Sequence, residues 1–166
     1  MADKQHISQV LQQLYHEDIQ DRTEMHWDNA TKKKFAWLDR RDKKRRQSVL
    51  FLYQLGEVWS ASDFHHAALI FQHGETAKDY ATAQDFAKKA VELGDMSAKY
   101  LVAASTDRYL LSIGKPQRFG TQFIKNKSGE WKLVEPIDPD TTDEERAKYN
   151  VPPLSQALKQ YKEANL

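Results

Sequence analysis

Asp107-Arg108-Tyr-Leu-Leu-Ser-Ile-Gly114-Lys-Pro-Gln117-Arg-Phe119-Gly-Thr121-Gln122 is the stretch of sequence that decides the fold. Its first seven residues end a segment with helical apolar spacing, and a glycine and a proline follow, which are residues typical of the end of a helix. From the phenylalanine onward, apolar and polar residues alternate as they do in a strand. The stretch therefore predicts a change from helices to a β-hairpin at Gly114.

Before this boundary the sequence predicts a series of helices that are separated by glycines. Glycines 56, 74, 94 and 114 lie 18 to 20 residues apart, and each follows a segment with helical apolar spacing. The expected helices cover residues 5–26, 30–55, 63–73, 80–93 and 96–113, with Asn29, Ser62 and Asp79 as N-caps of the second, third and fourth. Frequent alanines in the later helices permit close packing. We expect antiparallel helical hairpins of tetratricopeptide-like character, without a strict repeat.

After Gly114 the sequence predicts one β-hairpin and two helices. Residues 119–124 and 130–134 alternate around a turn at 126–129. Residues 142–149 begin with Thr-Asp-Glu-Glu, a helix start, and a last helix is expected over 154–164. The prediction is one mostly α domain over 1–166, made of a helical array (5–114) and a hairpin with the C-terminal helix (115–166).

The composition excludes several classes of protein and of site. A hydrophobic fraction of 40% is incompatible with a disordered chain, and the near-equal 25 basic and 24 acidic residues give no overall field that would attract nucleic acid or anionic lipid. The chain has no cysteine, which excludes disulfides, thiolate zinc sites and a cysteine nucleophile. No segment is apolar enough to span a membrane. We expect a cytoplasmic protein, with secretion left open if a signal peptide has been removed.

Three motifs resemble those of a bacterial domain family of unknown function. They are Gln72-His73, Asp107-Arg108, and residues 114–122, which read Gly-Lys-Pro-Gln-Arg-Phe-Gly-Thr-Gln. Residues 18–22, Asp-Ile-Gln-Asp-Arg, resemble a shifted form of the Asp-Gln-x-x-Arg element that this family carries in its first helix. Phe119 stands where the family tends to have tyrosine. The resemblance implies a shared site that includes Gln72 and Arg22, and it implies no particular activity.

His73, Asp107 and Arg108 are the candidate catalytic residues, and each has a structural alternative. A histidine at a helix end can be a cation that offsets the helix dipole, or a general acid or base, because its ordinary pKa of about 6.5 suits proton transfer. Asp107 and Arg108 are adjacent on a helix and so point about 100° apart. They are expected either to pair with neighbouring helices, or to act in a site where Asp107 orients His73 and Arg108 binds a carboxylate or phosphate.

Gln117, Phe119, Thr121 and Gln122 are candidate substrate-binding residues. Their amide and hydroxyl groups fit recognition of a polar small molecule or peptide better than nucleophilic attack. The histidines at 65, 66 and 73 lack the spacing of a metal site, so no metal or other cofactor is predicted. The basic run over 32–46 is interpreted as a solvated helix face in preference to a nucleic-acid surface.

Two functions remain open at this stage. The first is a small enzyme without a cofactor, a hydrolase or lyase that acts on a polar or anionic small molecule or a modified peptide. In it, His73 would transfer protons, Arg108 would hold an anionic group, and the glutamines would orient the substrate. The second is a helical-repeat binding module that recognises a peptide or protein partner, with the same polar residues as an internal network. The sequence gives no indication of the oligomeric state.

Overall fold

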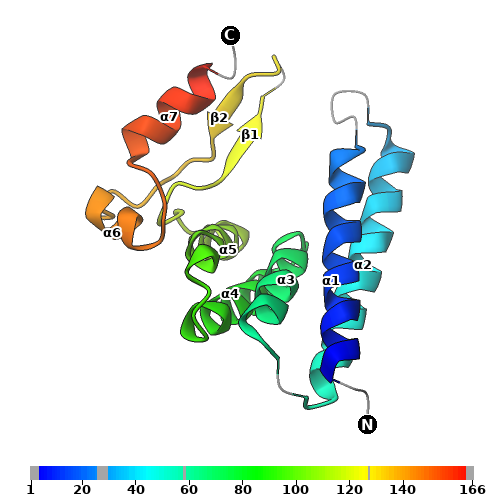
Figure 1. Cartoon of the computed structure of the whole chain (residues 1–166). Coiled ribbons are helices and arrows are strands. Elements are labelled where there is room, and N and C mark those ends of the chain that lie inside the picture. The colour runs from blue at the N-terminus through cyan, green and yellow to red at the C-terminus, as the bar shows by residue number, and fades with distance from the viewer. Residues whose placement is uncertain (1–3, 26–29, 58, 127, 164–166) are drawn as a thin grey trace.

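The structure, a computed structural model, is mostly α with one β-hairpin near the C-terminus (Figure 1), which confirms the predicted fold class. It describes residues 4–25, 30–57, 59–126 and 128–163. The helices in these residues are α1 (Lys4–Thr23), α2 (Lys32–Gln54), α3 (Ala61–Gln72), α4 (Ala77–Glu92), α5 (Lys99–Ser112), α6 (Asp143–Lys148) and α7 (Leu154–Glu163), with a 3₁₀ turn η2 (Met96–Ala98) before α5. The strands are β1 (Phe123–Lys125) and β2 (Trp131–Leu133).

Capping boxes start α3 and α4 two or three residues earlier than predicted. Ser60 caps α3, with its hydroxyl accepting from the Asp63 backbone N–H while the Asp63 carboxylate accepts from the Ser60 N–H. Thr76 and Asp79 form the same arrangement at α4. The predictions of Ser62 and Asp79 as N-caps were therefore wrong, because an acidic residue at the third helical position completes a box whose cap lies three residues earlier. Thr31 caps α2, and Asn29 lies outside the described residues.

Glycine ends three of the predicted helices by adopting a left-handed backbone. The φ angles of Gly56, Gly94 and Gly114 are +73°, +102° and +72°. Each glycine lies two residues beyond the end of a helix, where a side chain would strain this conformation. The regular spacing of glycines in the sequence thus marks true helix boundaries.

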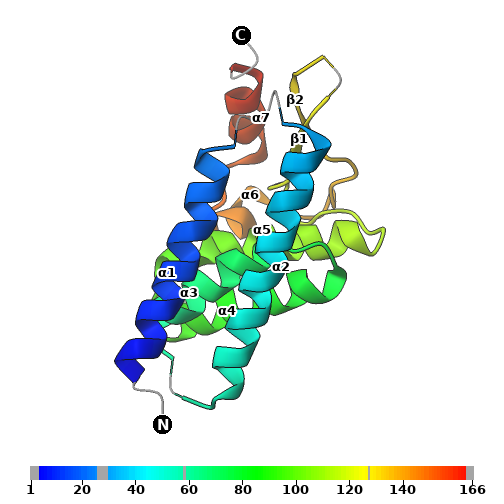
Figure 2. The same ribbon diagram turned by 90° about the vertical axis from the view of Figure 1, so that its right-hand side faces the viewer.

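The helices form two packed groups (Figures 1 and 2). In the first group, α3, α4 and α5 pack in chain order as antiparallel neighbours, so that α3 and α5 run in the same direction. In the second, α1 and α2 form a long hairpin whose α1 packs across α3, and whose upper half extends beyond the first group. The main core lies where the groups meet, and its larger buried members are Ile7, Leu11, Val49, Trp59, Ile70, Phe71, Phe86, Leu101 and Val102.

The β-hairpin is shorter than predicted and packs against α7. Its two strands pair antiparallel, with Ile124 opposite Lys132. Residues 119–122 were predicted to be the start of the first strand, but Gly120 has a φ of +71° and the segment forms a loop against α5 instead. The Phe123 ring stacks on Tyr161 of α7 at a centroid distance of 3.5 Å, which fastens the last helix to the sheet.

Within the described residues, no helix has the length and apolar character that crossing a lipid bilayer requires.

Candidate functional site

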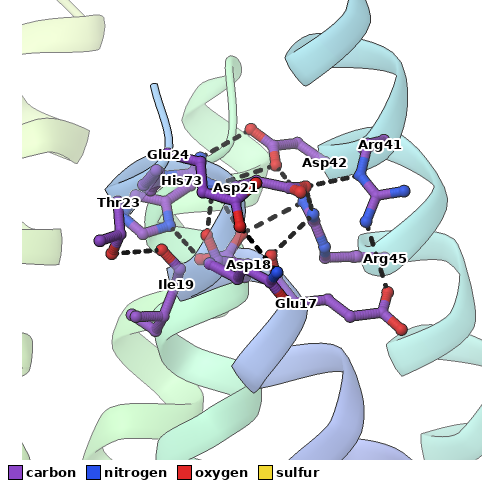
Figure 3. Close-up of polar contacts among 12 residues, drawn as sticks. Glu17, Asp18, Ile19, Asp21, Thr23, Glu24, Arg41, Asp42, Arg45 and His73 are labelled. Carbon is purple, nitrogen blue, oxygen red and sulfur yellow. Dashed lines mark hydrogen bonds and ion pairs between the residues drawn. The ribbon is translucent and has the colours of Figure 1, made fainter. Parts of the chain in front are cut away.

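His73 is held by a buried carboxylate from a distant part of the chain. It is the C-cap residue of α3, and its Nδ1 lies 2.8 Å from Oδ2 of Asp18 in the middle of α1 (Figure 3). The Asp18 side chain is 1% exposed, whereas that of His73 is 22% exposed. Arg46 of α2 donates a hydrogen bond to the His73 carbonyl, so both the ring and the backbone of this residue are fixed.

Asp18 belongs to an ionic network between α1 and α2. Its other oxygen accepts from Arg22 at 2.8 Å and lies 3.5 Å from Arg45. Both arginines also bind Asp42, Arg22 through two hydrogen bonds and Arg45 at 2.6 Å, and Arg45 is ion-paired with Asp21. Burial raises the pKa of Asp42, while its contacts with Arg22 act against this rise. Burial likewise lowers the pKa of Arg45.

The pairing with Asp18 decides which nitrogen of His73 is left for chemistry. A carboxylate accepts hydrogen bonds, so the contact favours the tautomer that carries its hydrogen on Nδ1. Nε2 has no hydrogen-bond partner among the described residues. A histidine whose Nδ1–H is held by a carboxylate presents Nε2 as a proton acceptor, and this is the arrangement of the general base in hydrolases that carry a His–Asp pair.

Asp107 does not contact His73, but organises the loop that follows α5. The fully buried carboxylate accepts hydrogen bonds from the backbone N–H groups of Arg118, Phe119 and Thr121 at 2.7, 2.8 and 2.9 Å, and from the Thr121 hydroxyl at 2.7 Å. With four donors around it, this side chain has no remaining capacity to orient another group. The carboxylate that contacts His73 is therefore that of Asp18, and not that of Asp107 as predicted.

Three of the predicted substrate-binding residues are internal supports of the same loop. Gln117 is fully buried, and its amide accepts from the Gln122 N–H and donates to the Val134 carbonyl. Phe119 is buried and packs against Tyr149. The Thr121 hydroxyl is bound to the carboxylate described above. None of the three directs a free polar group away from the loop.

Gln72 and Arg108 differ from these residues because each buries a polar atom without a partner in the described residues, whereas the Gln122 amide is bound. Oε1 of Gln72 and Nε of Arg108 are buried and have no hydrogen-bond partner in the part of the chain that the structure describes. The Gln122 amide donates to the Ala104 carbonyl at 3.3 Å, one helical turn before Arg108. A buried polar atom without a partner is rare in proteins and calls for a ligand, a water or an ion.

Gln72 is the last residue of α3, and Arg108 lies in the C-terminal half of α5. His65, seven residues before Gln72, binds Asp95 just ahead of η2 and α5 at 2.6 Å, which brings the side of α3 that carries His65 against the start of α5. Seven residues are about two helical turns, so Gln72 lies about 10 Å further along the same direction. On α5, Leu101 packs in the shared core, and Arg108 follows it by seven residues. The two helices run parallel, so both residues lie toward their C-terminal ends.

Arg22 and three arginines of the basic run on α2 form ion pairs that the sequence did not predict. Arg22 was predicted to bind substrate, but it bridges Asp18 and Asp42 and is itself largely buried. In the run over 32–46 the lysines are exposed, as a solvated face requires. Arg41, Arg45 and Arg46 instead form ion pairs with residues of α1 and α4, so the interpretation as a solvated face was wrong for them.

The residues that sequence reasoning missed are Asp18 as the partner of His73, and Asp42 with Arg45. The spacing of Asp18 and Arg22 is i,i+4 and that of Asp42 and Arg45 is i,i+3, which marks each pair as neighbours on a helix. Nothing in the sequence indicates that the two pairs meet each other, or that His73 joins them. The described residues contain no group of three or more His, Cys, Asp or Glu side chains that could hold a metal ion.

Comparison of the chain with protein-family models, curated proteins and solved structures gave no match. The resemblance carried by residues 72–73 and 107–122 stays a prediction, and the candidate site rests on the geometry above.

Proposed function

We propose that the chain is a small hydrolase or lyase in which His73 is the general acid and base. The observation that carries the proposal is the 2.8 Å contact between Nδ1 of His73 and the buried Asp18 carboxylate. This contact supports a fixed tautomer with Nε2 available, on a ring that is partly exposed. Arg108 and Gln72, with their unpaired buried atoms, are the groups proposed to bind a polar or anionic part of the substrate.

The proposed chemistry needs only one group that moves a proton. In hydrolysis, Nε2 takes a proton from water as the oxygen attacks an acyl or phosphoryl centre. The same proton then passes to the leaving oxygen or nitrogen, so that histidine returns to its starting state. In a lyase, Nε2 would take a proton from carbon and deliver it to the leaving group. Asp18 stabilises the protonated ring in either case, and Arg108 offsets negative charge on the substrate.

The test is a screen of p-nitrophenyl esters and phosphate mono- and diesters with the parent chain and the His73→Gln variant. Glutamine can still donate a hydrogen bond to Asp18, so the variant is expected to fold. Loss of a positioned acid–base group lowers the rate by roughly 10²- to 10⁴-fold. The matched control is His65→Gln, because His65 also binds a carboxylate through Nδ1, that of Asp95, but lies at the opposite end of α3. Equal loss in both variants, or no loss in His73→Gln, would overturn the proposal.

The alternative function, a peptide-binding helical module, is favoured by an exposed apolar patch at the connection between α2 and α3. Phe51, Tyr53 and Leu55 at the end of α2 are exposed, and Leu93 just after α4 is more than half exposed. Tyr53 and Leu93 line a hollow with Trp59, whose buried Nε1 has no partner in the described residues. If the screen yields no activity that depends on His73, this patch is the surface on which to seek a peptide ligand.

A further inference from the structure

A second hollow adjoins the motif loop and has aromatic walls. Its lining includes Tyr100 of α5, Phe123 of β1 and Tyr161 of α7, together with Thr121 of the loop after α5. Its remaining lining residues are Gly120, Val151, Pro152, Ala157 and Gln160. The volume is about 230 Å³. A cavity of about 150 Å³ accepts benzene, so this hollow has room for one substituted aromatic ring.

Aromatic rings line much of the hollow. Phe123 and Tyr161 stack on each other, 3.5 Å between centroids and 14° between planes, so a ligand would contact their edges and outer faces and the ring of Tyr100. The hydroxyls of Tyr100 and Tyr161 have no hydrogen-bond partner among the described residues. Stacked and edge-on contacts with such rings favour an aromatic guest, and the free hydroxyls can bind a polar substituent on it.

Arg108 does not line the hollow itself, but follows its lining residue Tyr100 by eight residues, about 12 Å, along α5. Tyr100, Ala104 and Arg108 follow one another at intervals of four residues, so they share one face of the helix. A long helical side chain leans toward the helix N-terminus, which directs the Arg108 guanidinium toward Tyr100. Gln122 connects α5 to the hollow, because its amide donates to the Ala104 carbonyl and to the hydroxyl of Thr121, which lines the hollow.

The electrostatics of Tyr100 agree with this arrangement. Burial raises the pKa of its phenol, Tyr161 and Asp107 raise it further, and the Arg108 charge acts in the opposite direction. The guanidinium is therefore close enough to act on a group that lines the hollow.

We infer that the hollow binds the aromatic ring of a ligand whose anionic group, a carboxylate or a phosphate, is bound by Arg108. The unpaired buried Nε of Arg108 supplies a charged donor, and the rings of Tyr100, Phe123 and Tyr161 supply an aromatic lining. The inference rests on the proposed function for the role of Arg108, and it narrows the substrate class to small aromatic acids and aryl phosphates.

Binding of simple probes tests the inference without a known substrate. Phenyl phosphate and benzoate carry both features, inorganic phosphate has the charge without the ring, and benzyl alcohol has the ring without the charge. In titrations followed by amide NMR signals, phenyl phosphate or benzoate should bind at least about tenfold more tightly than either single-feature probe and should shift the signals of Gly120 and Thr121. The better of the two acids identifies the anionic group. Phenyl phosphate and benzoate that both bind no better than the single-feature probes would overturn the inference.

Amino-acid substitutions test which residues bind the aromatic ring of the probe and which bind its negative charge. Arg108→Gln should weaken binding of the aromatic acids by about tenfold and leave benzyl alcohol unchanged. Tyr161→Leu should weaken binding of the aromatic acids and of benzyl alcohol by about fivefold. Tyr53→Leu is its matched control, because Tyr53 is a half-exposed tyrosine in the other aromatic hollow, and it should change neither. Equal effects of the Tyr161 and Tyr53 substitutions would refute the assignment.

The His73→Gln variant separates this inference from the proposed function. Its rate of ester hydrolysis reports on His73, whereas the ring and charge preference of the parent chain reports on the hollow, which His73 does not line. If this variant hydrolyses the screening esters as fast as the parent, the proposed function fails while the binding result stands. If probes with both a ring and a charge bind no better than the single-feature probes, but activity depends on His73, the inference fails and the proposed function stands.

Discussion

Replacement of Asp107 by alanine should destabilise the protein by about 4 kcal/mol. The substitution removes the acceptor for three backbone N–H groups and one hydroxyl, at distances of 2.7 to 2.9 Å. A buried donor left without an acceptor costs about 1–3 kcal/mol, and hydrogen bonds to a charged group are among the stronger ones. The sum of four such terms is an upper limit, because the loop can shift and admit water. About 4 kcal/mol corresponds to a fall in Tm of roughly 8–16 °C for a chain of this size.

Asp107→Asn should have about half this effect, roughly 2 kcal/mol, since one amide oxygen can still accept while the amide nitrogen faces a donor. Arg108→Ala is the control, because the neighbouring side chain has an unpaired buried nitrogen, and its removal should change stability by less than about 0.5 kcal/mol or raise it. Urea unfolding followed by circular dichroism measures all three variants. If Asp107→Ala unfolds at the urea concentration of the parent, or Arg108→Ala loses as much stability as Asp107→Ala, the division into loop anchor and ligand group is wrong.

Three further predictions concern stability. His66 stacks on Tyr15, and burial lowers the pKa of His66, so the unfolded chain binds a proton more readily than the folded chain. The parent therefore loses stability as the pH falls from about 7 to about 5, and His66→Phe, which cannot take up this proton, should gain stability relative to it. Urea unfolding at the two pH values measures the difference. Arg45→Met should cost about 3–5 kcal/mol by orphaning buried carboxylates, and because burial limits screening, unfolding titrations in low and high salt should give nearly the same cost. Gly120→Ala should cost about 1–2 kcal/mol in a thermal melt, because φ is +71° and the added Cβ would lie 3.1 Å from Leu154.

The fold was predictable because its determinants are local. Gly56, Gly94 and Gly114 end helices through their own backbone conformation, and the apolar spacing between them gives the helices directly. The hairpin follows from the alternation around residues 126–129. The errors at the N-caps were also local. Asp79 was chosen in place of Thr76, the first residue of its capping box, and Ser62 was chosen in place of Ser60, another serine two residues earlier. The predicted start of the first strand was wrong because Asp107, a residue of α5, holds residues 118–121 in a loop.

The site was predictable only in part, because its decisive contacts join distant segments. The motifs drew attention to His73 and Arg108, but Asp18 lies 55 residues from His73, and nothing in the sequence identifies it as the partner. Asp107 illustrates the converse problem. A conspicuous acidic residue in a motif can be a candidate for catalysis or an anchor for backbone N–H groups, and only the surrounding donors distinguish the two.

The degree to which each polar group is satisfied therefore separates support from chemistry in this protein. Asp107 and Gln117 have partners for the groups that they bury, so a ligand could bind them only by breaking hydrogen bonds that hold the loop. Arg108 and Gln72 bury atoms that lack a partner in the described residues, so binding a ligand there restores interactions instead of removing them. His73 combines both conditions, with Nδ1 held by Asp18 and Nε2 without a described partner. A group that is fixed on one side and unpaired on the other can exchange a proton without loss of its own position, and for this reason the proposed activity should depend on His73 rather than on Asp107.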